Sequence, residues 1–226
     1  GSVSSIWSLS PSPRSTSALM ASPRARGLFQ RAIGESGGLF EPKQLAPGYL
    51  LANAELDGAR YAASLGASSL NELRRRPAAD FLGAGAQAVT HPVIEPFVLP
   101  ESPYEAFAAG RQAAVPVLVG SNAEEARSLI DVSKVTASTF AAGLAKSFGP
   151  LPPALADAYP HRTDDEAREA RLGLERDLRF GWDMWAWARL QAVTGKNNVY
   201  YYSFDQRPPF PADSAYAGWG ASPFSE

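Results

Sequence analysis

The pentapeptide at residues 34–38, Gly-Glu-Ser-Gly-Gly, is the feature that most constrains the fold. It matches the pattern G-x-S-x-G, in which a serine sits on a sharp turn between a strand and a helix, above an α/β sheet. The preceding residues 27–33 have the composition of a strand. A helix is not expected to follow, because Pro42 has no amide hydrogen and disfavours helical geometry at Glu41. Ser36 therefore has the sequence of such a turn without the helix that normally continues it.

A series of further segments accompanies this motif along the chain. Residues 4–12 read S-S-I-W-S-L-S-P-S, residues 17–23 read S-A-L-M-A-S-P, and residues 27–38 read G-L-F-Q-R-A-I-G-E-S-G-G. Residues 102–110 read S-P-Y-E-A-F-A-A-G, and residues 115–126 read V-P-V-L-V-G-S-N-A-E-E-A. In this order they resemble the type-B carboxylesterase/cholinesterase family of α/β-hydrolases. Members carry S-A-L-M-A-S-P, G-L-F-x-R-A-I-x-x-S-G, S-P-x-E-A-F-A-A-G and V-P-x-L-V-G-S-N-x-D-E-G in the same order.

The resemblance assigns roles to three residues. Without gaps, Ser10 falls on the family's nucleophile, Ser36 on a second serine beside the catalytic acid, and Glu125 on that acid. The glycines that flank the family's nucleophile are serines here, and Pro11 follows Ser10. Because the oxyanion hole uses the backbone N–H of the residue after the nucleophile, and proline has none, this position is altered. Ser10 and Ser36 thus both stay candidates for the nucleophile, and Ser36 is alternatively a structural serine that hydrogen-bonds Glu125.

The base has only two candidates, His161 and His91, because the chain contains two histidines. An acyl-transfer serine needs a base within hydrogen-bond reach. Pro223 stands where the family carries its catalytic histidine, so we predict that His161 is recruited as the base, with His91 as the other possibility. The resemblance covers the middle-to-late part of the family's length. The two histidines show no metal-ligand spacing, so we expect neither a metal nor another cofactor.

Composition indicates which classes of partner and which cellular compartment to expect. The formal net charge of −2 argues against a nucleic-acid-binding surface. No apolar run approaches the roughly 20 residues that cross a bilayer, so we expect no membrane span. Cysteine is absent, which excludes disulfides. Together with the resemblance, this favours a bacterial, cytoplasmic protein.

The hydrophobic patterns and turn residues predict an α/β chain. Residues 115–120 form a continuous apolar run, typical of a strand that is buried on both faces of a parallel sheet. Expected strands are residues 4–7, 31–34, 115–120 and 199–204. Expected helices are residues 15–26, 49–65, 68–76, 78–83, 102–110, 137–148, 152–159 and 163–193, with a further helix that starts at Ala123 and is capped by Asn122.

The predicted fold is therefore a partial α/β-hydrolase, with a short, mostly parallel sheet of about four strands and flanking helices. Residues 1–226 are expected to form one truncated domain, in which residues 45–112 are a mostly helical insertion and residues 205–226 an irregular tail. An unpaired, apolar sheet edge favours self-association, so we predict a dimer. The tryptophans at 182, 185 and 187 are interpreted as core.

The predicted function is hydrolysis of short-chain carboxylic esters through an acyl-serine intermediate, with weak or promiscuous activity. The expected partner is a small-molecule ester. The alternative is a catalytically inactive α/β-hydrolase remnant that binds a small apolar ester or a protein.

Overall fold

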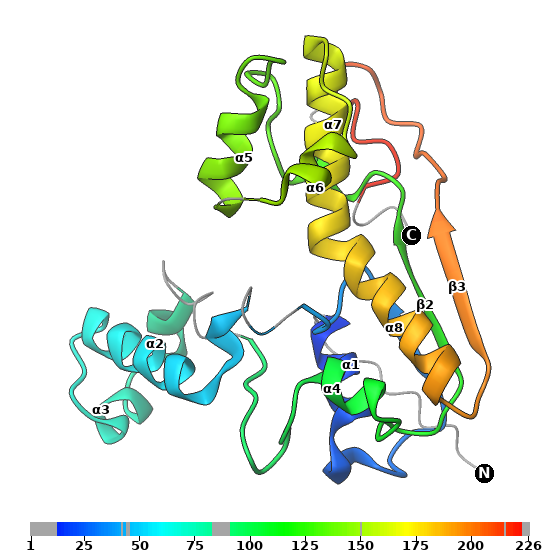
Figure 1. Cartoon of the computed structure of the whole chain (residues 1–226). Coiled ribbons are helices and arrows are strands. Elements are labelled where there is room, and N and C mark those ends of the chain that lie inside the picture. Colours follow the sequence, from blue (N-terminus) through cyan, green and yellow to red (C-terminus); the bar gives the residue numbers. More distant parts are fainter. Residues whose placement is uncertain are drawn as a thin grey trace. The chain divides into compact units, whose positions relative to one another are not determined.

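The computed structural model describes residues 13–41, 43, 46–82, 91–149, 151–214 and 216–222. The chain divides into two compact units (Figure 1). Unit 1 consists of Gly1–Ile33, Gly38–Val117 and Arg189–Val199, and unit 2 of Gly34–Gly37, Leu118–Ala188 and Tyr200–Glu226. The single domain expected from the sequence stays a prediction.

The sheet of the described residues has three strands in the order β1-β2-β3. The strands are β1 (Ala32–Glu35), β2 (Val117–Asn122) and β3 (Val199–Phe204). In unit 1, Ala32 N–H donates to the Pro116 carbonyl at 3.1 Å, and in unit 2 Ser36 N–H donates to the Gly120 carbonyl at 2.9 Å. From the first of these hydrogen bonds to the second, the residue numbers rise equally along both strands, so β1 and β2 are parallel. The predicted parallel sheet is thus confirmed, with three described strands; residues 4–7, the fourth predicted strand, lie outside the described residues.

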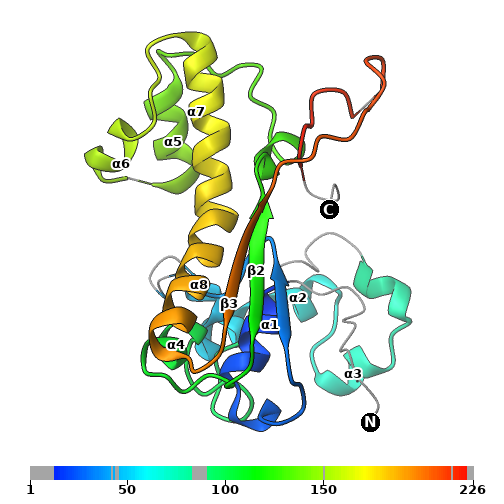
Figure 2. The same cartoon turned by 90° about the vertical axis from the view of Figure 1, so that its right-hand side faces the viewer.

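Helices and short 3₁₀ turns recur along unit 1. They are α1 (Pro13–Ala21), η1 (Pro23–Ala25), η2 (Pro47–Tyr49), α2 (Leu51–Ser64), α3 (Leu70–Arg74), η3 (Ala78–Leu82) and α4 (Pro103–Ala108). α1 and α4 lie side by side (Figures 1 and 2). The rings of Phe40 and Phe107, both fully buried, meet edge to face with centroids 5.1 Å apart. The core of this unit therefore lies between these helices and the segment that follows β1.

A small helical cluster dominates unit 2. Its elements are η5 (Glu125–Ser128), α5 (Phe140–Phe148), α6 (Pro153–Asp157), α7 (Asp164–Arg176) and the π-helical turn η6 (Asp177–Gly181). The buried side chains of α5 and α7, among them Phe140, Leu144 and Leu174, pack against each other. Apolar residues at helical spacing on both helices account for this contact.

The long predicted helix at residues 163–193 is interrupted once. α7 passes through the π-helical turn into α8 (Trp182–Thr194). The interpretation of the three tryptophans as core is correct only for Trp187, which is fully buried, whereas Trp182 and Trp185 are 40% and 47% exposed. The two exposed rings instead contact each other, with centroids 5.5 Å apart.

Candidate functional site

Ser36 occupies a constrained turn at the carboxyl end of β1. Its φ is +59°, the left-handed region that non-glycine residues rarely adopt and that recurs at functional sites. Its backbone N–H is held by the Gly120 carbonyl of the neighbouring strand. The turn therefore fixes the direction of the Ser36 side chain.

The side chain of Glu125 is the hydrogen-bond acceptor for the Ser36 hydroxyl. Ser36 Oγ donates a short hydrogen bond to Glu125 Oε1, and the backbone N–H of Asn122 donates to the same oxygen at 2.9 Å. The Glu125 side chain is fully buried. A carboxylate removed from water needs such donors to remain stable, and these two supply them. The hydrogen bond expected between Ser36 and Glu125 is thus present.

The two residues meet because they follow neighbouring parallel strands. Ser36 comes directly after β1, and Glu125 comes three residues after β2. The carboxyl ends of parallel strands lie at the same edge of the sheet, which is where ligands bind in open α/β folds. The pair therefore lies at the edge of the sheet where such folds bind ligands.

The turn that carries Glu125 differs from the prediction. Instead of a helix that starts at Ala123 with Asn122 as its cap, the chain forms the four-residue 3₁₀ turn η5, whose N-cap is Glu124. The Asn122 side chain is 1% exposed, and neither of its polar atoms has a hydrogen-bond partner among the described residues. The prediction was wrong because the backbone of Asn122 is used by the Glu125 carboxylate, a contact that capping rules do not include.

The loop around Ser36 packs against the π-helical turn and α8. A Cβ at Gly34 would lie 2.4 Å from the ring of Trp187, and a Cβ at Gly37 would lie 3.9 Å from the ring of Phe180. Gly37 has φ of +123°, a conformation that favours glycine. The glycines of the motif therefore serve close approach and turn geometry on either side of the serine.

Glu124, the residue before Glu125, has a different set of partners. Its backbone N–H donates to the Ala221 carbonyl, and its Oε2 accepts from the Ala221 N–H, both at 2.9 Å. Its Oε1 accepts from Arg127 at 2.8 Å and from Arg207 at 3.0 Å. Burial acts to raise the pKa of Glu124, but the Ala221 N–H and the two arginines outweigh burial and hold the pKa below its usual value.

A polar cavity of about 280 Å³ lies beside Glu124, between η5 and α7. Its charged lining residues are Glu124, Arg127, Glu169, Arg176 and Arg207. The two glutamates form ion pairs with Arg127 and Arg207. These four groups therefore neutralise one another, and Arg176 forms its ion pair with Asp177 at 2.7 Å.

The predicted bases have other partners. His161 lies between α6 and α7, where its Nδ1 is 2.8 Å from the Tyr159 carbonyl oxygen and its ring stacks on Phe140 at 4.4 Å. Within the described part of the chain, neither Ser36 nor Glu125 is a hydrogen-bond partner of His161.

The remaining two candidates are His91 and Ser10. His91 belongs to unit 1, where its ring lies 5.3 Å from that of Tyr49. Ser10 lies outside the described residues. Among the residues that the structure does describe, no group of three His, Cys, Asp or Glu side chains could hold a metal ion.

The sequence reasoning missed Asn122, Glu124 and Ala221 as members of the site. The available signal was the tandem of two acidic residues directly after a buried strand, Glu124 and Glu125. Nothing in the local sequence of Ala221 indicates its contact with Glu124, because the two residues are 97 positions apart.

Comparison with known proteins gives the family. The model of the Carboxylesterase family matches residues 13–221. The chain belongs to the carboxylesterase family. A para-nitrobenzyl esterase of Bacillus subtilis (strain 168) is 30% identical over 212 residues, which are 87% of this chain and 41% of that protein. Carboxylesterase 1C of Rattus norvegicus is 29% identical over 222 residues, 88% of this chain and 40% of that protein.

Solved carboxylesterase structures also match in three dimensions. A PNB esterase aligns with a TM-score of 0.68 and 28% identity, covering 93% of this chain and 43% of the other. The carboxylesterase EST55 of Geobacillus stearothermophilus aligns with a TM-score of 0.68 at 24% identity, covering 88% and 43%, and shows the shared fold. The predicted α/β-hydrolase fold class is thereby confirmed. The chain spans about two fifths of the length of the relatives that it matches.

In the described ranges of this carboxylesterase-family chain, no helix is both long enough and apolar enough to cross a bilayer.

Proposed function

We propose that this chain is a carboxylic-ester hydrolase that forms an acyl-serine intermediate and acts weakly on short-chain esters. The observation that carries the proposal is the hydrogen bond from Ser36 to the buried Glu125 at the carboxyl ends of two neighbouring strands. Membership of the carboxylesterase family supports the reaction class. The lack of cysteine further favours a bacterial, cytoplasmic setting, which we also propose.

Glu125 is proposed to be the orienting acid. In acyl transfer by serine enzymes, a buried carboxylate holds the base in position and stabilises its positive charge. Full burial and two directed hydrogen bonds to Oε1 suit Glu125 to that role, because they fix the direction of its carboxyl group.

The nucleophile is proposed to be Ser10 or Ser36. Ser10 is favoured by the resemblance, although Pro11 removes an oxyanion donor whose loss reduces turnover by about 10²–10³ in a working enzyme. Ser36 is favoured by its motif and its strained turn. Its contact with Glu125 places a carboxyl group rather than an imidazole beside the hydroxyl, and a carboxyl group is ordinarily the weaker base of the two. Either route predicts slow hydrolysis.

The base is proposed to be His161 or His91. For His161 this requires the histidine to exchange its contacts with Tyr159 and Phe140 for a contact with a reacting serine. That exchange is a second reason to expect weak activity.

Hydrolysis of p-nitrophenyl acetate and p-nitrophenyl octanoate by Ser10→Ala, Ser36→Ala and Glu125→Gln tests the proposal. We expect the acetate to be hydrolysed faster than the octanoate, and one serine variant to lose at least tenfold in kcat/KM. Circular dichroism of each variant controls for unfolding. If folded variants of both serines keep the original rate, the acyl-serine route is wrong.

The second candidate function is an inactive member of the family that binds an apolar ester or a protein. The observation that favours it is the engagement of His161 with Tyr159 and Phe140. Labelling with an organophosphonate probe, read by mass spectrometry, separates the two functions. A labelled Ser10 or Ser36 supports the hydrolase, and an intact unlabelled chain supports the inactive protein.

A further inference from the structure

Segment 205–222, which follows β3, is bound by Glu124 at two points near its end. The Glu124 N–H donates to the Ala221 carbonyl, and the Ala221 N–H donates to Glu124 Oε2, so both backbone groups of Ala221 are used by one residue. Ala221 is 0% exposed, although the sequence predicts an irregular tail there. Figure 2 shows this orange-to-red segment beside the green turn that follows β2.

Gly220 makes this approach possible. Its φ is +62°, and a Cβ there would lie 1.8 Å from Glu124 Oε2. A side chain at this position would therefore meet both a strained backbone and the carboxylate itself. The close contact depends on glycine for both reasons.

Glu124 also binds the beginning of the same segment. Arg207 donates to Glu124 Oε1 at 3.0 Å, so the segment is attached near both of its described ends to one side chain. Arg127, from η5 itself, donates to the same oxygen and continues the ion pair to Glu169 on α7 at 2.8 Å. Hydrogen bonds to a charged acceptor are stronger than neutral ones, so the Glu124 carboxylate is a strong attachment point for the segment.

Consecutive residues of one short turn thus have separate partners. Glu125 accepts a hydrogen bond from the Ser36 hydroxyl, and Glu124 accepts one from the Ala221 N–H of the segment. Both belong to unit 2. Glu124 is the N-cap of η5 and Glu125 its first residue, and a planar peptide bond joins them, so a backbone displacement at Glu124 also moves Glu125.

We propose that Glu124 is a positioning residue that holds segment 205–222 against the turn carrying Glu125. The catalytic part of this inference rests on the proposed ester hydrolysis. The contact between Glu124 and the segment is independent of it, and the two are tested by separate measurements.

Hydrogen exchange read by mass spectrometry tests the contact in the full chain. In Glu124→Ala we expect the amides of residues 216–222 to exchange about tenfold to a hundredfold faster, since a hydrogen bond to a charged group and its ion pairs are lost. The matched control is Glu169→Gln, which weakens an ion pair of Arg127 without touching the segment, and it should leave these amides unchanged. Equal exchange in Glu124→Ala and the unaltered protein would overturn the proposal.

Gly220→Ala provides a second route to the same effect. Its methyl group would displace the Glu124 carboxylate and speed exchange of the segment as Glu124→Ala does. Because both changes break one contact, while Gly220→Ala also strains the backbone, the increase in exchange in the double variant should be smaller than the two single increases combined. Additive increases would show that Glu124 and Gly220 act separately, contrary to the proposal.

Kinetics with p-nitrophenyl acetate test the positioning role. We expect Glu124→Ala to lower kcat at least fivefold with KM changed less than twofold, Glu124→Asp to restore part of kcat, and Glu169→Gln to match the unaltered protein. An unchanged kcat together with faster exchange would refute the positioning role. If the unaltered chain hydrolyses no ester, the proposed function fails and the positioning role with it, while the exchange result still decides the contact.

Discussion

The side chain of Trp187 limits which residue position 34 of β1 can hold. The Trp187 ring is fully buried and occupies the space that a Cβ at Gly34 would need, at 2.4 Å. A buried aromatic ring in a close-packed interior has little freedom to move. The glycine at the start of the serine motif is thus required by packing, in addition to any role in the turn.

Gly34→Ala should therefore destabilise the chain. We expect the free energy of unfolding to fall by about 1–3 kcal/mol, the usual effect of overpacking a core. Guanidinium denaturation followed by tryptophan fluorescence measures the change. The control is Gly58→Ala in α2, where nothing lies within 4 Å of the added methyl and helix propensity predicts a gain of about 0.5–1 kcal/mol. A Gly34→Ala variant as stable as the original would contradict the packing explanation.

At the scale of single elements, local signals predict the ends of helices well. The prediction for residues 102–110 used a serine cap, a proline in the first turn and a terminal glycine. The structure has α4 with Ser102 as N-cap and a complete capping box, in which Ser102 and Glu105 satisfy each other's backbone N–H. All of these groups lie within one helical turn, so the sequence alone specifies them.

Ser102→Ala should remove this cap. We expect a loss of about 1 kcal/mol in the free energy of unfolding, because the Glu105 N–H loses its acceptor, the hydroxyl of the buried Ser102. Ser64→Ala is the control, since that exposed hydroxyl bonds only within the last turn of α2, and it should change stability by less than about 0.5 kcal/mol. Equal effects of the two substitutions would show that the cap contributes nothing of its own.

The π-helical turn between α7 and α8 is bound by a tyrosine from outside the helix. Tyr159 donates from its hydroxyl to Asp177 Oδ2 at 2.7 Å. Burial, together with this hydrogen bond and the negative charge of Asp177, raises the pKa of Tyr159 to about 12. A raised folded-state pKa gives stability that is complete below the unfolded value near 10 and is lost as the pH rises through about 12.

Tyr159→Phe should remove this alkaline dependence. At pH 7 we expect the variant to be less stable by about 1 kcal/mol, the usual contribution of one hydrogen bond. Between pH 10 and 12 the difference from the unaltered protein should shrink, because only the unaltered protein has the tyrosine to ionise. Urea denaturation at pH 8, 10 and 11 measures it, and a difference that is constant over this range would contradict the assignment.

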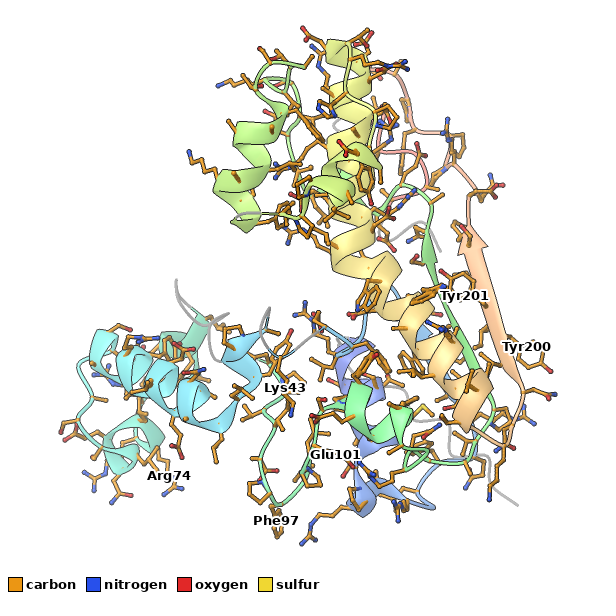
Figure 3. The ribbon with its side chains drawn as sticks, viewed as in Figure 1. Lys43, Arg74, Phe97, Glu101, Tyr200 and Tyr201 are labelled. Carbon is orange, nitrogen blue, oxygen red and sulfur yellow. The ribbon has the colours of Figure 1, made fainter. Side chains whose placement is uncertain are left out.

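At the scale of the whole molecule, β3 is an outer strand of the described sheet. Tyr200 and Tyr201 are 56% and 53% exposed, and Figure 3 shows them on opposite sides of β3. An outer strand with apolar, exposed side chains is a template for pairing with another chain. We propose that a second copy of this chain pairs there and forms the dimer.

Light scattering coupled to size-exclusion chromatography tests the dimer. We expect a concentration-dependent dimer, and a shift of at least tenfold in the dimer dissociation constant for Tyr200→Lys, because a lysine on an edge strand opposes pairing. Tyr104→Lys, at an exposed tyrosine of α4, is the control and should leave the dissociation constant unchanged. A monomer at every concentration would overturn the proposal.

Part of the site could be predicted from the sequence, namely its two central residues. Ser36 and Glu125 were identified through ordered motifs, and the hydrogen bond that joins them was expected. Their partners were not predicted. The contacts of His161 with Phe140 and of Glu124 with Ala221 depend on how helices and loops pack, which no local pattern encodes.

The sequence by itself determined the three described strands, the cap of α4 and the serine turn, because backbone preferences, caps and apolar periodicity act over a few neighbouring residues. Only the tertiary structure decided which tryptophan is buried, which groups surround Glu125 and where residues 216–222 attach. Those outcomes depend on contacts between residues far apart in the chain, such as the 89 positions between Ser36 and Glu125. Their energies exist only once the packed arrangement has formed.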